Sequence, residues 1–245
     1  MTDDDRGRLL DRMRADIALS GQHVALVQEG QTPRVGYTVG LTGDDRPEVV
    51  LAGGMALLAK PVLRTLKASA VVSRAGRLSD GGFLDIPGIG PFRAAAVHPS
   101  WTRLMLRRAM DLYDRDDVPA LQLVPDDPIR TLEVPDMSAP WDPEREPIWR
   151  WLVEDWNSDL PPDALAVTDL DALRGAPITQ AARWEAREWQ LFAAMNADIS
   201  SDVVRAVPLA TLLAIDPSLE PVTRLQIGDA IRRDPPGPWE RRLGR

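Results

Sequence analysis

The stretch of residues 34–55 constrains the fold of this chain more than any other. It reads RVGYTVGLTGDDRPEVVLAGGM and holds two short apolar runs rich in β-branched residues, at 35–41 and 49–52. The turn-forming residues of 42–47 separate the two runs. Runs of this kind on either side of a turn are typical of strands. The stretch therefore predicts a β-hairpin or a pair of neighbouring strands.

Two glycines make the first run a candidate binding site. Gly36 and Gly40 lie on either side of residues 37–39. A missing side chain in a strand lets a ligand or a second backbone approach closely. Polar and aromatic residues of this stretch and of later segments complete the set of candidates. The candidate ligand- or partner-binding residues are Tyr37, Thr38, Gly40, Glu48, His98, Trp101, Trp149 and Trp156.

The first half of the chain alternates between helical and strand patterns. Apolar residues recur at helical spacing in the segments 6–19, 55–72 and 101–113. Short apolar runs predict further strands at 23–27, 92–97 and 120–124, and the Gly-rich segment 76–91 is predicted as a loop between short strands. The strand at 23–27 is followed along the chain by the two strands of the stretch 34–55, and three consecutive strands favour an antiparallel meander. We therefore expect an α+β protein with an antiparallel or mixed sheet and flanking helices.

The composition changes from Pro125 onward. Six prolines occur between residues 125 and 147, and seven of the eight tryptophans lie after residue 140. Prolines at this density favour an extended connector. We predict an N-terminal α+β domain at 1–135, a Pro/Trp-rich connector at 136–175 and a small C-terminal α+β module at 176–245. Within the module the pattern predicts a strand-like run, a strand and a short helix at 184–192, 203–207 and 209–214.

Trp149 and Trp156 lie in a short segment that also contains Trp151. One interpretation is a short helix that packs the connector onto the first domain. The other is an aromatic contact surface for a partner, because tryptophan is favoured at binding hot spots.

The formal charge of −8 is concentrated in the second part of the chain. Residues 1–135 carry 17 basic and 18 acidic side chains, whereas residues 136–245 carry 12 and 19. Binding to a phosphate backbone relies on clustered Lys and Arg, so we expect no nucleic-acid partner. A basic protein partner suits this charge. The oligomeric state stays open.

Several classes of chemistry are excluded by composition. The absence of cysteine excludes disulfides, thiolate nucleophiles and Cys-ligated metal sites, and two histidines, His23 and His98, are too few for a His-rich metal site. No apolar run approaches the roughly 18 residues that span a bilayer. The acidic N-terminus argues against a signal peptide. We expect a cytoplasmic protein without membrane, metal or cofactor.

Motifs of known catalytic sites are also missing from the sequence. No GxSxG, Walker, HExxH or calcium-loop motif occurs, and Gly88-Ile89-Gly90 lacks the spacing of a dinucleotide-binding loop. Paired aspartates such as Asp44-Asp45 are interpreted as solvated loop acids. Acid–base catalysis by carboxylates stays open, because residues that converge only in space leave no pattern in the sequence. Because these motifs are missing, the sequence favours a protein that is not an enzyme.

Residues 8–145 resemble a bacterial family of unknown function, domain-of-unknown-function family 4262. The resemblance rests on these pieces: Asp16-Ile17, His23-Val24, residues 36–42 (GYTVGLT), residues 47–50 (PEVV), residues 97–101 (VHPSW), residues 121–124 (LQLV) and Trp141-Asp142. The chain departs from the family's pattern at Asp45-Arg46, where the family commonly has Gly-His, and at His98, where it has Asp. These departures put any histidine-dependent activity of the family in doubt here.

The segment of about residues 180–240 resembles a second family, domain-of-unknown-function family 2185, also named immunity protein 33. The shared pieces are residues 189–192 (WQLF), 207–209 (VPL), 215–219 (IDPSL) and 227–228 (IG). This resemblance implies a protein that binds and neutralises a toxin or another protein.

Two hypotheses for function follow. The first is a non-catalytic protein-binding or immunity-like interaction protein, favoured by the acidic second part and the missing catalytic motifs. The alternative is an enzyme or small-ligand-binding protein that uses the strand region from Gly36 to Gly40.

Overall fold

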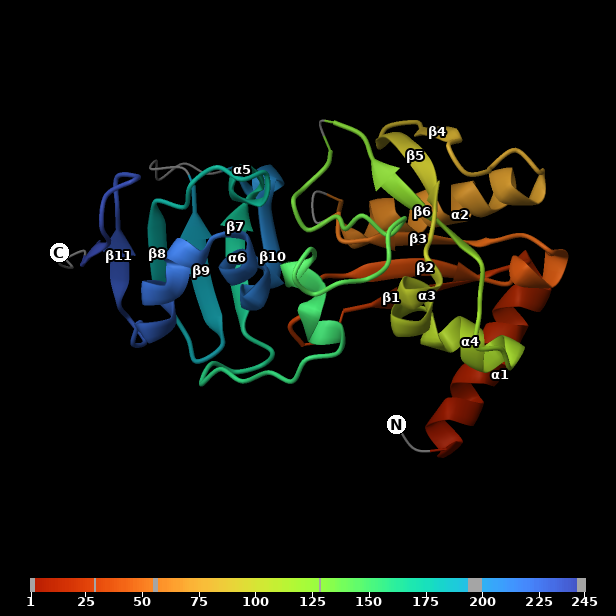
Figure 1. Cartoon of the computed structure of the whole chain (residues 1–245), viewed down its shortest axis with the longest axis horizontal. Helices are drawn as coiled ribbons and strands as arrows, with labels where there is room; N and C mark the ends of the chain where they lie inside the picture. Colours follow the sequence, from red (N-terminus) through yellow and green to blue (C-terminus); the bar gives the residue numbers. More distant parts are fainter. Residues whose placement is uncertain (1–2, 29, 55–56, 128, 194–199, 242–245) are drawn as a thin grey trace. The chain divides into compact units, whose positions relative to one another are not determined.

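The computed structural model describes residues 3–28, 30–54, 57–127, 129–193 and 200–241. The chain forms two compact units, each built around a mixed six-stranded sheet (Figure 1). The first unit comprises Met1–Val27, Arg34–Arg130 and Val134–Asp142, and the second comprises Gln28–Pro33, Thr131–Glu133 and Pro143–Arg245. Helices together with two mixed sheets confirm the predicted α+β class.

The first sheet has the order β1-β2-β3-β6-β5-β4. Its strands are β1 (His23–Val27), β2 (Val35–Val39), β3 (Glu48–Ala52), β4 (Phe83–Ile86), β5 (Gly90–Ala96) and β6 (Ala120–Pro125). The first three strands form the predicted antiparallel meander, with Ala25 opposite Tyr37 and Tyr37 opposite Val50. β3 pairs with β6 in parallel, so the sheet is mixed.

Helices cover both faces of this sheet, with α2 on one face and α1, α3 and α4 on the other (Figure 1). Their bounds are α1 (Asp3–Ser20), α2 (Ala59–Arg74), α3 (Pro99–Met105) and α4 (Arg107–Tyr113). Val62, Leu66 and Ala70 recur every four residues along α2 and are buried in the core. The helix predicted from residue 55 begins at Ala59, and residues 55 and 56 lie outside the described part. No helix among the described residues is long and apolar enough to cross a membrane.

Two expectations for the first unit are corrected. The predicted helix at 101–113 is two helices, because Leu106 leaves the helical region with φ −95° and ψ 34°. The Gly-rich segment predicted as a loop contains β4 and the start of β5, joined by a tight turn in which Ile89 N donates to Ile86 O. Gly88 has φ 73° in that turn, a conformation that favours glycine.

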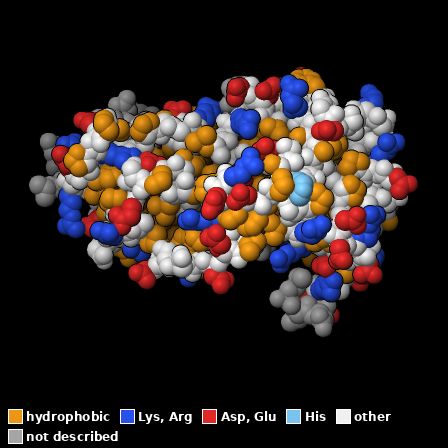
Figure 2. Space-filling view, viewed as in Figure 1, with side chains coloured by type: hydrophobic (Ala, Val, Ile, Leu, Met, Phe, Trp, Pro, Cys, Tyr) orange, Lys and Arg blue, Asp and Glu red, His pale blue; other side chains and the backbone are white. Residues whose placement is uncertain are grey.

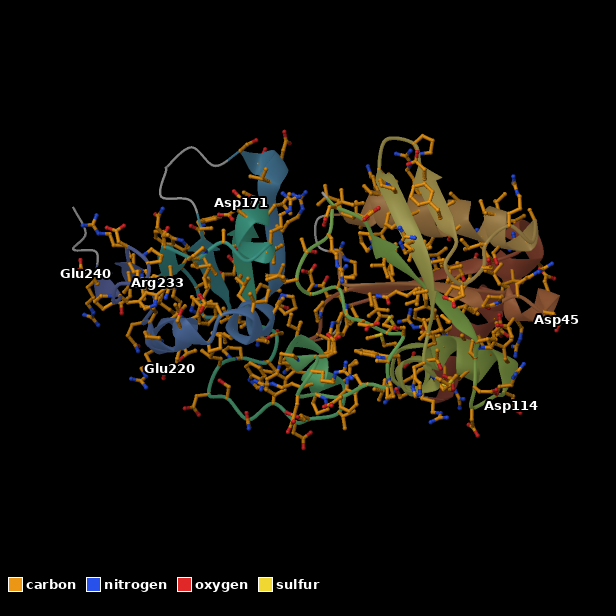
Figure 3. All side chains as sticks on the ribbon, turned by 45° about the horizontal axis from the view of Figure 1, so that its top comes forward. Asp45, Asp114, Asp171, Glu220, Arg233 and Glu240 are labelled. Carbon is orange, nitrogen blue, oxygen red and sulfur yellow. The ribbon has the colours of Figure 1, made fainter. Side chains whose placement is uncertain are left out.

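Left-handed backbone also occurs at two aspartates of the first unit. Asp45 (φ 56°) ends the short 3-10 helix η1 (Thr42–Asp44), and Asp114 (φ 51°) ends α4. Both lie at the same end of the unit (Figure 3). Aspartate tolerates this conformation better than most residues, so the chain can reverse there without glycine.

The second sheet has the order β10-β7-β9-β8-β11-β12. Its strands are β7 (Leu165–Asp169), β8 (Gln180–Arg183), β9 (Glu188–Phe192), β10 (Val204–Pro208), β11 (Ala230–Arg232) and β12 (Glu240–Arg241). The helical elements of the unit are α5 (Leu170–Leu173), α6 (Leu209–Ile215) and the 3-10 helices η2 (Pro147–Leu152), η3 (Ser201–Val203) and η4 (Pro217–Arg224). The segment 136–175, expected as a connector, thus contributes β7, α5 and η2 to this unit. The predicted strand-like run at 184–192 becomes a strand only at Glu188, and residues 184–187 form a turn after β8.

One face of the second sheet forms the core of its unit. Trp189, Leu191 and Ala166 on this face have no exposed surface. α6 contacts β10 and β7 and lies in front of the strands in Figure 1. Leu209 and Leu212 of α6 are buried as well, so helix and sheet enclose one apolar layer.

Candidate functional site

The carboxylate of Glu48 accepts four hydrogen bonds inside the first unit. Glu48 begins β3 and its side chain has no exposed surface. Oε2 accepts a hydrogen bond from Thr38 Oγ1 at 2.7 Å. Oε1 accepts from Gly40 N at 3.0 Å, Thr42 N at 3.0 Å and the Tyr113 hydroxyl at 2.5 Å. Four donors offset the cost of burying a carboxylate, which is large when such a group is left unpaired.

The strand pair of residues 34–55 positions this network. β2 and β3 are antiparallel, and Val49 N donates to Thr38 Oγ1 at 2.8 Å, which fixes the hydroxyl that bonds Glu48. The backbone after β2 then turns so that the amides of Gly40 and Thr42 point at the same carboxylate. Three of the four donors therefore come from residues 38–42, within ten residues of the acceptor.

The fourth donor, Tyr113, was not predicted from the sequence. Its hydroxyl donates to Glu48 and accepts from Gly40 N at 2.5 Å. Burial raises the pKa of the Tyr113 hydroxyl, and the charge of Glu48 raises it further. Nothing in the sequence around residue 113 indicates this role, because the contact spans 65 residues.

The two glycines of the predicted site serve the packing of the protein itself. A Cβ on Gly40 (φ 128°) would lie 2.8 Å from Gly21 O, and one on Gly36 would lie 2.9 Å from both Leu26 and Leu66. At Gly40 a second backbone approaches, which was one of the two alternatives for this run. Thr38 and Glu48 are enclosed by their protein partners, so a ligand would have to displace protein donors to reach them.

Tyr37 and His98 lie outside the Glu48 network. Tyr37 is buried, and it points to the other face of β2 from Thr38 because successive strand side chains alternate. His98 is the N-cap of α3, where Nδ1 accepts from Ser100 N at 3.2 Å and lies 2.9 Å from Ser100 Oγ. Ser100 Oγ in turn accepts from Trp141 N at 2.8 Å. Trp101 is fully buried and donates to Ala139 O at 3.0 Å.

Trp149 and Trp156 belong to the second unit. Trp149 is fully buried and its indole donates to Glu133 O at 3.0 Å, while η2 contacts α6. Trp156 is half-buried, donates to Leu160 O at 2.6 Å and meets Trp151 edge-on with ring centres 4.8 Å apart. Trp149 is thus a core residue of its unit, whereas Trp156 retains exposed surface.

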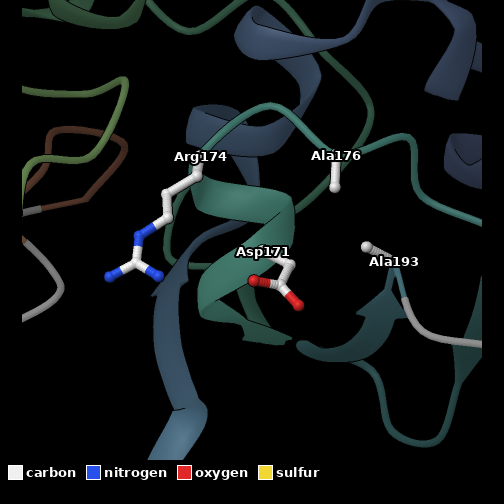
Figure 4. Close-up of a pocket in the computed structure, with 4 residues that line it drawn as sticks. All are labelled: Asp171, Arg174, Ala176 and Ala193. Atoms are coloured by element: carbon white, nitrogen blue, oxygen red, sulfur yellow. The ribbon is translucent and has the colours of Figure 1, made fainter. Parts of the chain in front are cut away.

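A pocket of about 280 Å³ opens beside α5 and is lined by Asp171, Arg174, Ala176 and Ala193. Figure 4 shows the Asp171 carboxylate on the side of α5 that faces Ala193, with the Arg174 side chain on the other side. Buried Asp169 holds the end of β9 here, since its carboxylate accepts from Ala172 N at 2.8 Å and from Ala193 N at 2.9 Å. None of these residues was predicted as a site. Within the described ranges, no cluster of three or more His, Asp or Glu side chains is placed to hold a metal ion.

One comparison with known proteins gives a match, and it covers part of the chain. Residues 16–132 match the model of the family described as "Domain of unknown function (DUF4262)". No curated protein and no solved structure matches the chain. The match contains Thr38, Glu48 and Tyr113, so the whole Glu48 network lies within the DUF4262 region.

The sequence pieces that resemble DUF4262 converge in the first unit. GYTVGLT supplies three donors to the Glu of PEVV, and the VHPSW piece is joined to Trp141 through Ser100. The Asp16-Ile17 and His23-Val24 pieces meet in a 2.7 Å contact between Asp16 Oδ2 and His23 Nδ1. In this chain these sequence pieces therefore make contacts that hold the first unit together. The match ends before the second unit's strands, so the resemblance of residues 180–240 to immunity protein 33 stays a prediction.

Proposed function

We propose that this protein is a non-catalytic, cytoplasmic binding protein of immunity type, whose second unit binds a basic protein. The observation that carries the proposal is the division of charge. The second unit holds 19 acidic and 12 basic residues, and the first holds 18 and 17. Nearly all of the net negative charge belongs to one unit, and a charge of one sign attracts a partner of the other.

Several basic side chains of the second unit are already paired. Arg187 lies 2.6 Å from Asp163, Arg224 lies 2.5 Å from Glu220, and Arg233 lies 2.8 Å from Asp216. Acidic and basic side chains are interspersed with hydrophobic ones on the face shown in Figure 2. On this face the acidic side chains do not form one separate patch, which favours a partner with a broad basic surface.

In this proposal the part of the chain that matches DUF4262 is a structural scaffold. Its most specific residues, Thr38, Gly40 and Glu48, satisfy one another inside the unit. Their hydrogen bonds stabilise the end of the sheet. Recognition is then assigned to the surface of the second unit.

Affinity capture tests the proposal, with the full chain as bait in a lysate of the host organism. We expect one basic protein in stoichiometric amount, bound with an affinity that falls as salt is raised, because salt screens exposed charges. Co-expression should suppress any toxicity of that protein if the role is immunity. The proposal would be contradicted if no stoichiometric partner were recovered, or if the affinity of the recovered partner did not change with salt concentration.

A further inference from the structure

The second sheet has one face that the helices of its unit leave open. Side chains alternate along its strands, and Ala166, Ala181 and Trp189 point into the core. Their neighbours on the other face are exposed or half-buried: Leu165, Val167, Ala182, Trp184, Glu188 and Gln190. We call these six residues the outer face. Leu165 is 38% exposed and Trp184 is 55% exposed.

Strand register places Trp184, Glu188 and Leu165 side by side. Leu165 of β7 pairs with Glu188 of β9, and Trp184 N donates to Glu188 O at 3.1 Å across the β8–β9 turn. Residues directly opposite each other in neighbouring strands point to the same face, with Cβ atoms roughly 5 Å apart. A carboxylate therefore lies between an aliphatic and an aromatic side chain at one end of the outer face.

The turn that carries Trp184 is held rigidly by Arg183. The Arg183 guanidinium donates to Leu225 O at 2.9 Å and to Ala186 O at 3.0 Å, and lies 4.4 Å from the centre of the Trp189 ring. These contacts turn Arg183 towards the core side of the sheet. Trp184 is thus presented on a fixed backbone, which lowers the entropy cost of binding through it.

Arginines stack on three other tryptophans of this unit. Arg150 lies 4.3 Å from the centre of the Trp151 ring. Arg183 lies 4.4 Å from the centre of the Trp189 ring, and Arg233 lies 4.4 Å from the centre of the Trp239 ring. Among the residues that the structure describes, no arginine lies over Trp184. The Trp184 ring is half exposed, and the Glu188 carboxylate lies beside it. An arginine guanidinium is planar and positively charged, so it can stack on the ring and pair with the carboxylate.

The local charge also fits a basic occupant. Glu185 is exposed on the same turn as Trp184 and adds a second carboxylate. The nearby Arg187 is compensated by Asp163 at 2.6 Å, and Arg183 faces the other side of the sheet. The surroundings of Trp184 are therefore acidic.

We propose that Trp184 and Glu188 bind an arginine side chain of a basic protein partner, with Leu165 contacting an apolar neighbour of that arginine. The guanidinium stacks on the Trp184 ring while its N–H groups donate to the Glu188 carboxylate. This inference rests on the proposed function and assigns the binding surface to the outer face.

A random peptide library displayed on phage and selected against the immobilised full chain tests this site. We expect selected peptides to share an arginine next to an apolar residue. Trp184→Ala and Glu188→Gln should each weaken binding of such a synthetic peptide by about tenfold. Replacing the arginine of the peptide by lysine should weaken it several-fold, because the planar fork is lost.

Matched controls lie elsewhere in the same unit. Val153→Ala trims another apolar side chain, 58% exposed, and Glu154→Gln neutralises another exposed acid. Neither should change the affinity, and all four variants should melt as the wild type does. Failure to select any peptide, peptides without arginine, or equal binding by Trp184→Ala would overturn the site. A captured basic protein that binds wild type and Trp184→Ala equally would leave the proposed function standing and remove only this site.

Discussion

The Tyr113 hydroxyl, in the last residue of α4, donates a hydrogen bond of 2.5 Å to Oε1 of Glu48 in the first residue of β3. The contact fastens a helix to the sheet end where the backbone of residues 40–42 turns. Because the carboxylate is fully buried, each of its donors contributes to the stability of the DUF4262 region.

Removal of the Tyr113 hydroxyl should destabilise the first unit. Tyr113→Phe keeps the ring and takes one donor from a buried carboxylate, which costs about 1–3 kcal/mol. Chemical denaturation followed by circular dichroism measures the loss. A double-mutant cycle with Glu48→Gln should show coupling between the two positions. Purely additive effects would mean that the hydrogen bond contributes nothing.

Glu48→Ala should cost more than Tyr113→Phe. The substitution leaves the amides of Gly40 and Thr42 and the Thr38 hydroxyl without their acceptor. Unsatisfied buried donors cost about 1–3 kcal/mol each, so we expect a loss of at least about 3 kcal/mol. The midpoint of urea unfolding reports it. A loss smaller than that of Tyr113→Phe would contradict the assignment of Glu48 as the centre of the network.

Alanine at Gly40 should destabilise the protein, and alanine at Gly43 should not. A Cβ at Gly40 meets Gly21 O at 2.8 Å on a backbone with φ 128°, whereas a Cβ at Gly43 meets nothing within 4 Å. We expect Gly40→Ala to cost about 1–3 kcal/mol from strain and overpacking. Thermal melts of the two variants compare them directly. Equal melting temperatures would show that the backbone approach is not a constraint.

Stability should fall in alkaline solution because of Tyr113. Burial raises the pKa of its hydroxyl above that of an unfolded tyrosine, which is about 10. The folded state then holds its proton more tightly, so the contribution is complete below about pH 10 and is lost as the pH rises further. Denaturation between about pH 8 and about pH 11 should show a steeper decline for the wild type than for Tyr113→Phe. Parallel curves would contradict the raised pKa.

Local patterns in the sequence predicted much of the first unit. The β-branched runs at 35–41 and 49–52 form β2 and β3, and the meander follows from their short connections. Thr38, Gly40 and Glu48 were among the eight candidate binding residues, and they lie together in a hydrogen-bond network inside the unit. Each of these relations spans only a few residues, so the sequence pattern contains them.

Relations between distant segments were not predictable in this way. Tyr113 reaches Glu48 only because the two helices after β5 return the chain to the start of β3. The strand β7 was missed because residues 136–175 were predicted as a connector from the six prolines between residues 125 and 147. Within that segment, the run LAVTD nevertheless alternates between more and less exposed positions as far as Thr168. The outer face depends on the register of three strands, which no single segment reveals.

The central position of β6 has a consequence for synthesis on the ribosome. β6 lies between β3 and β5, although it is the last strand of the first sheet to be translated. Until residues 120–125 have emerged, β3 and β5 each present an unpaired edge, and open edges recruit strands from other chains. A nascent or truncated chain that stops before Ala120 therefore consists of two separate half-sheets, each with an aggregation-prone edge.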